Sequence, residues 1–423
     1  MGKNLLNVGI IGTGFIVKKS HIPGFAKSDK FVVKGLYDIK KENAEDAKKQ
    51  YLKLLKKNKN HDVLKIAEKE TRIYESLGEM ITDVDVVDIC TPPKYHVNNL
   101  KMALDAEKHV ICEKPLARNW WTAHDLDITK FGGDLKFQLH TQGIWNPLIE
   151  KGKKLLVDGI VGDIQKIRIL HQGADPKHTV KLGALWDKVH SGGGALTDIG
   201  PHAFASMWYW LGDGWSPKSV KANLVEATKP VRKIAGVPDT KVEVEDDAHI
   251  TITWKNDDGK EITGELEATW NKKNWFPDGK SKGSSLAPDL YYEVQGTKGT
   301  FSFPHVIFSL SNPFGLAVAF KVIRPDGTKE MIKNPLPPGG IEDFIFFDEF
   351  GNVINDDSIE SRNSLEFSID MLTIFGAAYL SRKKGGEVVS IDDFKQHATN
   401  IGSKHDNPSD ATEAIIVDLF EGF

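Results

Sequence analysis

The stretch Gly9-Ile10-Ile11-Gly12-Thr13-Gly14-Phe15-Ile16-Val17 follows an apolar run that begins a few residues into the chain. A first strand that ends in two such glycines is typical of the βαβ unit that binds dinucleotides. Gly12 allows the tight turn, and Gly14 lets the backbone approach a pyrophosphate. The helix that follows would present its positive N-terminus to the phosphates.

An acidic residue ends the next apolar segment, at the distance that such a unit requires. The segment Phe31–Tyr37 is followed by Asp38, 24 residues after Gly14. An acid in this position accepts hydrogen bonds from a ribose diol, and its charge repels a 2′-phosphate, which favours NAD over NADP. Lys40 and Lys41 lie close by in the sequence and weaken that preference.

A plain strand–turn–helix remains the alternative. Glycines also mark ordinary turns, and Val17 stands where a third small residue is usual. Because strand, turn, helix and distal acid occur together, the pattern favours nucleotide binding. The residues predicted to contact the cofactor here are Gly12, Thr13, Gly14, Phe15, Ile16 and Asp38.

The composition is that of an ordinary soluble globular protein with more than one domain. A chain of 423 residues exceeds the size of a single hydrophobic core. Its net charge of −4 does not favour nucleic acid as a partner. We see no apolar run of membrane-spanning length and no secretory leader, and we expect a cytoplasmic protein with no membrane partner. Cys90 and Cys112 lie in apolar runs, which favours buried thiols over a disulfide, and we predict no metal site.

The first part of the chain alternates between strands and helices. Helical patterns occupy 41–57, 62–70, 74–81 and 95–107, and the apolar runs Val84–Cys90 and His109–Cys112 are strand-like. This alternation predicts an α/β domain over 1–145 with a doubly wound parallel sheet. Ligands of such sheets bind at the carboxyl ends of the strands, where Gly12, Asp38, Thr91 and Glu113 fall.

The rest of the chain has a different pattern. Strands with alternating apolar residues dominate from about 160 to 330, which predicts an α+β domain over 146–395 with an open-faced antiparallel sheet packed on helices. We expect the other face of this sheet to serve self-association into a homo-oligomer, from a dimer to a tetramer or larger. Residues 271–289 are loop-like, 363–383 are helical, and 396–423 form a C-terminal extension. Within that extension, Ala414–Phe420 is apolar enough to dock on a neighbouring subunit.

The tripeptide Glu113-Lys114-Pro115 comes directly after a buried strand and so at the ligand edge of the sheet. A lysine there is placed near a nicotinamide ring, where its ammonium can stabilise an alkoxide or polarise a carbonyl. A cis bond before Pro115 would aim Lys114 inward. The alternative is a lysine in a surface loop.

The second cluster of candidate residues is the run Ser191–His202, which contains three consecutive glycines. Pro201 suits the first position of a helix, so His202 falls in the first turn, where the positive helix end favours a neutral, basic imidazole. Asp198 lies four residues earlier and can reach the same side. A neutral histidine with a carboxylate and an ammonium can handle a proton. The alternative is that Asp198 caps the helix and His202 packs in the core.

These residues resemble the Gfo/Idh/MocA oxidoreductases, the family of glucose–fructose oxidoreductase and the inositol dehydrogenases. The resemblance covers roughly residues 5–390 and is most specific in Glu113-Lys114-Pro115 and in the glycine run that ends at His202. Thr91-Pro92-Pro93, followed by His96, also fits. It implies a Rossmann domain followed by an open-faced sheet, with NAD as cofactor and Thr91, Pro92, His96, Glu113 and Lys114 among the residues that bind it. It also implies Lys114, Asp198 and His202 as the catalytic trio, with His202 as acid/base, and a sugar, inositol or related polyol as substrate, bound between the domains.

Some features depart from the family pattern. The helical region over 45–77 is longer than usual, and His140–Pro147 stands where many relatives carry an arginine. Within that stretch, Gln142 and Asn146 are predicted to meet neutral hydroxyls, which suggests an uncharged sugar. Trp186 and Trp145 are the best-placed stacking platforms for a sugar, and Asp187 and His190 lie near the presumed substrate.

The sequence thus predicts reversible oxidation of a secondary alcohol by NAD. His202 takes the hydroxyl proton, Lys114 steadies the oxyanion, and Asp198 orients His202 or another substrate hydroxyl. Two alternatives remain on the same scaffold. One is a dinucleotide-sensing regulator without turnover, and the other is an enzyme that retains NAD and transiently oxidises, then cleaves, a glycoside.

Overall fold

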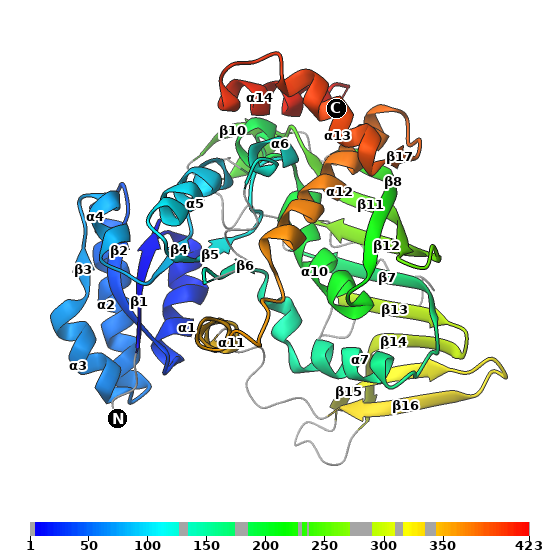
Figure 1. Cartoon of the computed structure of the whole chain (residues 1–423). Coiled ribbons are helices and arrows are strands. Elements are labelled where there is room, and N and C mark those ends of the chain that lie inside the picture. Colours follow the sequence, from blue (N-terminus) through cyan, green and yellow to red (C-terminus); the bar gives the residue numbers. More distant parts are fainter. Residues whose placement is uncertain are drawn as a thin grey trace. The chain divides into compact units, whose positions relative to one another are not determined.

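This computed structural model describes residues 5–126, 134–173, 185–226, 231–234, 237–270, 290–308, 316–334 and 344–422. The chain divides into two compact units, each described separately below (Figure 1). The first comprises Met1–Ala117, Thr122–Trp145 and Glu342–Ile369. The second comprises Arg118–Trp121, Asn146–Ile341 and Asp370–Phe423. The loop predicted over 271–289 lies outside the described residues.

The first unit is built on a six-stranded sheet in the order β3-β2-β1-β4-β5-β6 (Figure 1). All of its ladders are parallel. From β1 the chain adds β2 and β3 on one side and then β4, β5 and β6 on the other, so the order of the strands switches between β1 and β4. Ligands of such sheets bind at the carboxyl ends of the strands beside this switch point. The strands are β1 (Leu6–Ile11), β2 (Phe31–Tyr37), β3 (Arg72–Ile73), β4 (Val86–Ile89), β5 (His109–Glu113) and β6 (Phe137–His140).

Helices connect these strands, as parallel pairing requires. Apolar residues at helical spacing on α2, such as Ala44, Ala47, Tyr51 and Leu55, are buried. The prediction of a doubly wound parallel sheet is confirmed. The helical elements are the π-helical turn η1 (Val17–His21), α1 (Ile22–Lys27), α2 (Lys41–Lys57), α3 (His61–Glu70), α4 (Leu77–Thr82), the 3₁₀ turns η2 (Pro93–Tyr95) and η4 (Gln142–Trp145), α5 (His96–Asp105) and α11 (Phe344–Asn355).

The second unit contains a nine-stranded sheet in the order β16-β15-β14-β13-β7-β12-β11-β8-β17 (Figure 1). A separate pair is formed by β9 (Val231–Ile234) and β10 (Val237–Lys241). The strands of the large sheet are β7 (Ile164–Gln172), β8 (Trp215–Glu226), β11 (Glu245–Asn256), β12 (Glu261–Thr269), β13 (Leu290–Gly296), β14 (Gly299–Phe308), β15 (Leu316–Ile323), β16 (Lys329–Asn334) and β17 (Val389–Ser390).

The sheet of the second unit is mixed rather than purely antiparallel. β7 pairs parallel with β12 and antiparallel with β13, whereas the other described ladders are antiparallel. The expectation of an antiparallel sheet therefore needs one correction. Its physical reason is the long connection between β7 and β12, which includes helices as well as β8 and β11 and so allows the two strands to run in the same direction.

Helices bury one face of this sheet. α10 (Gly200–Leu211) packs against β7 and β12, and the alternating side chains Ile250, Ile252 and Trp254 of β11 are buried. The other helices that lie in this unit are α7 (Pro147–Val157), α8 (Lys188–Ser191), α9 (Ala195–Asp198), α13 (Ile391–Gly402) and α14 (Pro408–Leu419). Two helices contribute to both units, α6 (Trp120–Ala123) and α12 (Leu365–Lys383).

The end of the chain packs within the second unit. Ile415, Ile416 and Leu419 of α14 are buried, and the ring of Phe420 lies 4.7 Å from that of Tyr379 between centroids. The apolar character of this stretch, which suggested docking on a neighbour, is therefore accounted for within its own unit. Among the helices that the structure describes, none combines the length and apolar character needed to cross a membrane.

Candidate active site

The glycine turn after β1 has the geometry that a nucleotide requires. Gly12 has a φ of +83°, and a Cβ there would lie 3.0 Å from both the Cys90 oxygen and the Thr91 nitrogen. A Cβ at Gly14 would meet nothing within 4 Å. The backbone at Gly14 thus borders open space, as the close approach of a pyrophosphate requires. Val17 is fully buried at the start of the π-helical turn η1.

Asp38 stands beside this turn, directly after β2. Its Oδ2 accepts hydrogen bonds from the backbone N–H (2.7 Å) and the hydroxyl (3.1 Å) of Thr13, and its Oδ1 accepts one from the Lys40 N–H (2.8 Å). The carboxylate therefore joins the ends of β1 and β2, a structural role that the sequence did not reveal. Phe15 and Ile39 flank it with exposed apolar side chains, 58% and 90% accessible.

The loop after β4 is tied to the loop after β5 by His96. Its Nε2 lies 2.6 Å from the Thr91 carbonyl oxygen, and its Nδ1 lies 2.9 Å from that of Pro115. Burial lowers the pKa of His96 against the opposing effect of these carbonyls. His96 thus supports the site from the interior, whereas Thr91 is half-buried and Pro92 is exposed.

Lys114 directly follows β5. The Lys114–Pro115 bond is cis. The backbone N–H of Lys114 donates to Oε2 of Glu113 at 3.0 Å, and the side chain of Lys114 is half-buried. The side chain of Glu113, in contrast, is buried beneath the strand ends. Gly12, Asp38, Thr91 and Lys114 therefore all lie at the carboxyl end of the parallel sheet, after β1, β2, β4 and β5.

The glycine run of the second unit is required by close packing. A Cβ at Gly192, whose φ is +79°, would lie 2.1 Å from the Arg118 carbonyl oxygen. A Cβ at Gly194 would lie 2.0 Å from the carbonyl oxygen of Glu245. Larger residues would displace this loop, which leads directly into Asp198.

Glu245, at the start of β11, anchors the same loop from below. Its Oε1 accepts hydrogen bonds from the N–H groups of Gly194 and Leu196 (both 3.0 Å) and from the hydroxyl of Tyr379 (2.9 Å). Burial raises the pKa of Glu245 to about 7, and these donors offset part of that effect. Sequence reasoning missed Glu245 and Tyr379, because both reach the loop from distant segments of the chain.

Asp198 and His202 sit on consecutive helices. Asp198 ends α9, and its Oδ2 accepts a hydrogen bond from the indole of the buried Trp270 at 3.0 Å. His202 lies in the first turn of α10, as its position after Pro201 predicted, and is half-buried. The two residues are thus held on the packed face of the mixed sheet.

A second histidine, His171 near the end of β7, lies beside His202. The two rings are nearly parallel (8°) with centroids 6.4 Å apart. Burial lowers the pKa of His171 to about 3, with a smaller contribution from His202, so the ring is neutral. Its Nε2 lies 2.6 Å from the hydroxyl of Tyr292, from which a neutral ring can accept a hydrogen bond. The sequence offered no signal for this residue, because His171 is one of several polar residues in β7.

The residues predicted to contact substrate lie in several environments. Asn146 caps α7, since its Oδ1 accepts a hydrogen bond from the Leu148 N–H at 2.9 Å. His190 is exposed and lies 2.8 Å from Asp187, which caps α8. Trp186 has no exposed surface. The side chain of Gln142 lies outside what the structure describes.

Comparison with known proteins finds family models that match both parts of the chain. Residues 6–128 match the oxidoreductase family with an NAD-binding Rossmann fold, and residues 149–302 match the GFO/IDH/MocA C-terminal domain. Levoglucosan dehydrogenase of Pseudarthrobacter phenanthrenivorans is 26% identical over 361 residues, 79% of this chain and 82% of that protein. Glucose-6-phosphate 3-dehydrogenase of Bacillus subtilis is 24% identical over 314 residues, 71% of this chain and 75% of that protein.

A solved structure of levoglucosan dehydrogenase with NADH and L-sorbose has the same fold. It has a TM-score of 0.70 at 22% identity and covers 92% of this chain and 100% of that one. The two family matches span both units in the order in which the sequence predicted a Rossmann domain and a sheet domain. The chain belongs to the Gfo/Idh/MocA family of NAD-binding oxidoreductases.

Proposed function

We propose that this chain is an NAD-dependent dehydrogenase that oxidises a secondary hydroxyl of a sugar, glycoside or inositol. The observation that carries the proposal is the occurrence of two motifs in one chain. Lys114 lies at the carboxyl end of the parallel sheet of the first unit, directly after β5. Asp198 and His202 lie on α9 and α10, which pack on the mixed sheet of the second unit. A purely sensing protein has no need of such proton-handling groups. The relatives named as dehydrogenases of levoglucosan and of glucose 6-phosphate support a carbohydrate substrate.

The three side chains have distinct roles in the proposal. NAD, when bound, supplies the hydride acceptor. His202 accepts the proton of the substrate hydroxyl, and Lys114 stabilises the negative charge that develops on that oxygen. Asp198 orients His202 or a second hydroxyl of the substrate. The proposal requires all three to act on one bound molecule.

The cofactor role of the first unit follows from its turn. Gly12, Thr13, Gly14, Phe15 and Ile16 would surround the pyrophosphate, with Thr91, Pro92 and Lys114 toward the nicotinamide and His96 and Glu113 behind them. Asp38 would meet the adenosine ribose and disfavour NADP, and the exposed Ile39 offers an apolar surface to the adenine.

The substrate is proposed to be uncharged. Gln142, at the end of the first unit, and Asn146, Trp186 and His190 of the second unit are the further proposed substrate contacts. Because Trp186 is buried and Asn146 caps α7, these two act in the proposal only if their immediate surroundings adjust to the substrate. We also propose that the protein is cytoplasmic and forms a homo-oligomer through the face of the mixed sheet that the helices leave uncovered. The proposed domain boundaries are 145/146 and 395/396, with the C-terminal extension after the second boundary.

The proposal is tested by replacing Lys114. Lys114→Met should lower kcat by about a hundredfold or more, because an oxyanion contact is lost, while the Kd for NAD stays within about threefold. The assay follows reduced nicotinamide with a panel of levoglucosan, glucosides, hexoses and inositols. Lys101→Met is the matched control, because that exposed lysine of the same unit pairs with Asp125 at 3.1 Å. Equal activity of the two variants would refute the role of Lys114.

A further inference from the structure

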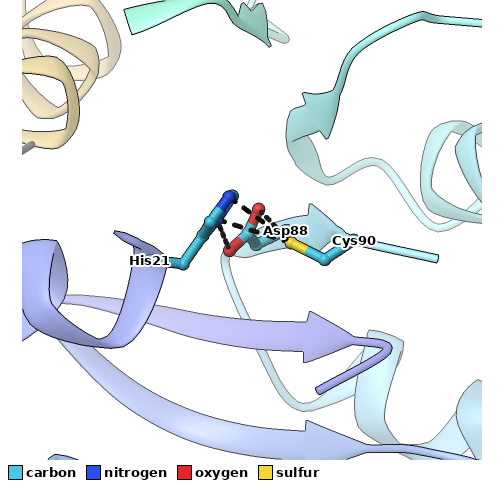
Figure 2. A group of neighbouring side chains, drawn as sticks. All are labelled: His21, Asp88 and Cys90. Carbon is cyan, nitrogen blue, oxygen red and sulfur yellow. Dashed lines mark hydrogen bonds and ion pairs between the residues drawn. The ribbon is translucent and has the colours of Figure 1, made fainter. Parts of the chain in front are cut away.

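Five buried polar side chains lie beneath the carboxyl ends of β4, β5 and β6. They are His21, Asp88, Cys90, Glu113 and His140. Figure 2 shows three of them, with the ring of His21 from η1 meeting Asp88 and Cys90 from the end of β4. Two carboxylates without surrounding water are costly unless a positive charge lies between them.

His21 is placed to supply that charge. Its Nδ1 lies 2.8 Å from Oδ2 of Asp88, and its Nε2 lies 3.0 Å from Oε1 of Glu113. Carboxylate oxygens only accept hydrogen bonds, so the ring serves both when both nitrogens carry protons. Burial is the largest single influence and opposes this charged form, but Asp88 and Cys90 together outweigh it and hold the pKa of His21 well above its ordinary value.

Glu113 connects this charge to Lys114. Its Oε1 lies 3.0 Å from Nε2 of His21 and 2.7 Å from Nδ1 of His140. Its Oε2 accepts a hydrogen bond from the backbone N–H of Lys114 at 3.0 Å. Burial would raise the pKa of Glu113, but His140 and His21 together hold it well below its ordinary value. Two imidazoles therefore hold Oε1 of the carboxylate, and Oε2 in turn holds the backbone N–H of Lys114.

The same side chains include donor sets that a metal ion favours, namely His21 with Asp88 and Cys90, and His21 with Glu113 and His140. Around a tetrahedral zinc ion, nitrogen and oxygen donors are separated by roughly 3.3 Å or more. The three pairs that His21 and His140 make with the carboxylates are 2.7–3.0 Å apart. These are hydrogen-bond distances, and they favour a proton-bridged network over a metal centre.

We propose that Glu113 is a positioning residue for Lys114, held in place by a His21 imidazolium that bridges it to Asp88 and by His140. This inference rests on the proposed role of Lys114. The network holds the backbone of Lys114 at the strand end, so that the ammonium is presented to the reacting oxygen in one orientation. Misplacement of a catalytic group by about 1 Å can cost a hundredfold in rate.

Two substitutions separate geometry from charge. In Glu113→Gln, the amide oxygen can still accept the Lys114 N–H, and the amide nitrogen can donate to both imidazoles once Nε2 of His21 and Nδ1 of His140 carry no proton, so kcat should stay within about fivefold of the unaltered protein. In Glu113→Leu the acceptor is gone, and kcat should fall about a hundredfold while the Kd for NAD changes less than about threefold. Thr71→Val is the matched control, a buried hydroxyl of the same unit that bonds the Val33 carbonyl oxygen instead.

A readout without turnover distinguishes failure of this network from failure of the proposed function. Nitrogen-15 spectra of the histidines, with His21 assigned by His21→Gln, should show both ring nitrogens of His21 protonated at about pH 8.5, two units above the ordinary pKa. Metal analysis of the purified protein should find no bound zinc in stoichiometric amount. A neutral His21, stoichiometric zinc, or a loss of kcat of about a hundredfold in Glu113→Gln would overturn the proposal, and none of these outcomes requires Glu113→Leu to fold.

Discussion

At the scale of single residues, the carboxyl group of Glu245 decides how the loop before Asp198 responds to pH. Its folded-state pKa of about 7 lies above the ordinary value of 4.5, mainly through burial. Between these values the folded protein keeps the proton that the unfolded chain releases. The contribution of this group to the free energy of unfolding is therefore fully present below about pH 4.5 and is lost as the pH rises to about 7.

Glu245→Gln should remove this dependence. The two pKa values differ enough to change the free energy of unfolding by about 3 kcal/mol across the window. Denaturant titrations at several pH values should measure this difference. Between about pH 4.5 and pH 7, the free energy of unfolding of the unaltered protein should fall by about 3 kcal/mol relative to that of Glu245→Gln. Parallel curves for the two proteins would show that Glu245 is ionised throughout in the folded state.

At the scale of elements, the loop between α8 and α9 packs by contact of backbone on backbone. Gly194 faces the Glu245 carbonyl oxygen at a distance that no Cβ tolerates. Gly194→Ala should therefore lower the free energy of unfolding by about 2 kcal/mol or more and impair turnover, because the loop leads into α9, which ends in Asp198. Gly78→Ala in α4 is the control, since the nearest atom to its Cβ would be 3.9 Å away. Equal melting temperatures for the two variants would contradict this account.

Single elements also show what the sequence could and could not predict. Gly12 and the place of His202 in its helix follow from local rules of backbone geometry, whereas the sequence only allowed for the cis Lys114–Pro115 bond. The parallel pairing of β7 with β12 and the burial of α14 in its own unit depend on contacts between distant segments. His171, Glu245 and Tyr379 were missed for the same reason, because each meets the site only after the sheet and α12 have formed.

At the scale of the whole molecule, the first unit should be stabilised by the cofactor that it prefers. A ligand that binds only the folded state at about a hundred times its Kd adds about 2.7 kcal/mol to the free energy of unfolding. NAD should therefore raise the melting temperature, and NADP at the same concentration should raise it less, because Asp38 repels a 2′-phosphate. A larger effect of NADP would show that Lys40 and Lys41, rather than Asp38, decide the preference.

Direct hydride transfer is the central claim, and isotope transfer tests it most directly. The purified protein is incubated with NAD and with polyols, among them levoglucosan, glucosides and inositols, each deuterated on the carbons that bear secondary hydroxyls. The account predicts that at least one uncharged polyol reduces NAD, that deuterium appears on the nicotinamide ring, and that Lys114→Met abolishes the transfer. Binding of NAD without transfer from any of these polyols would contradict the account and favour a regulator without turnover.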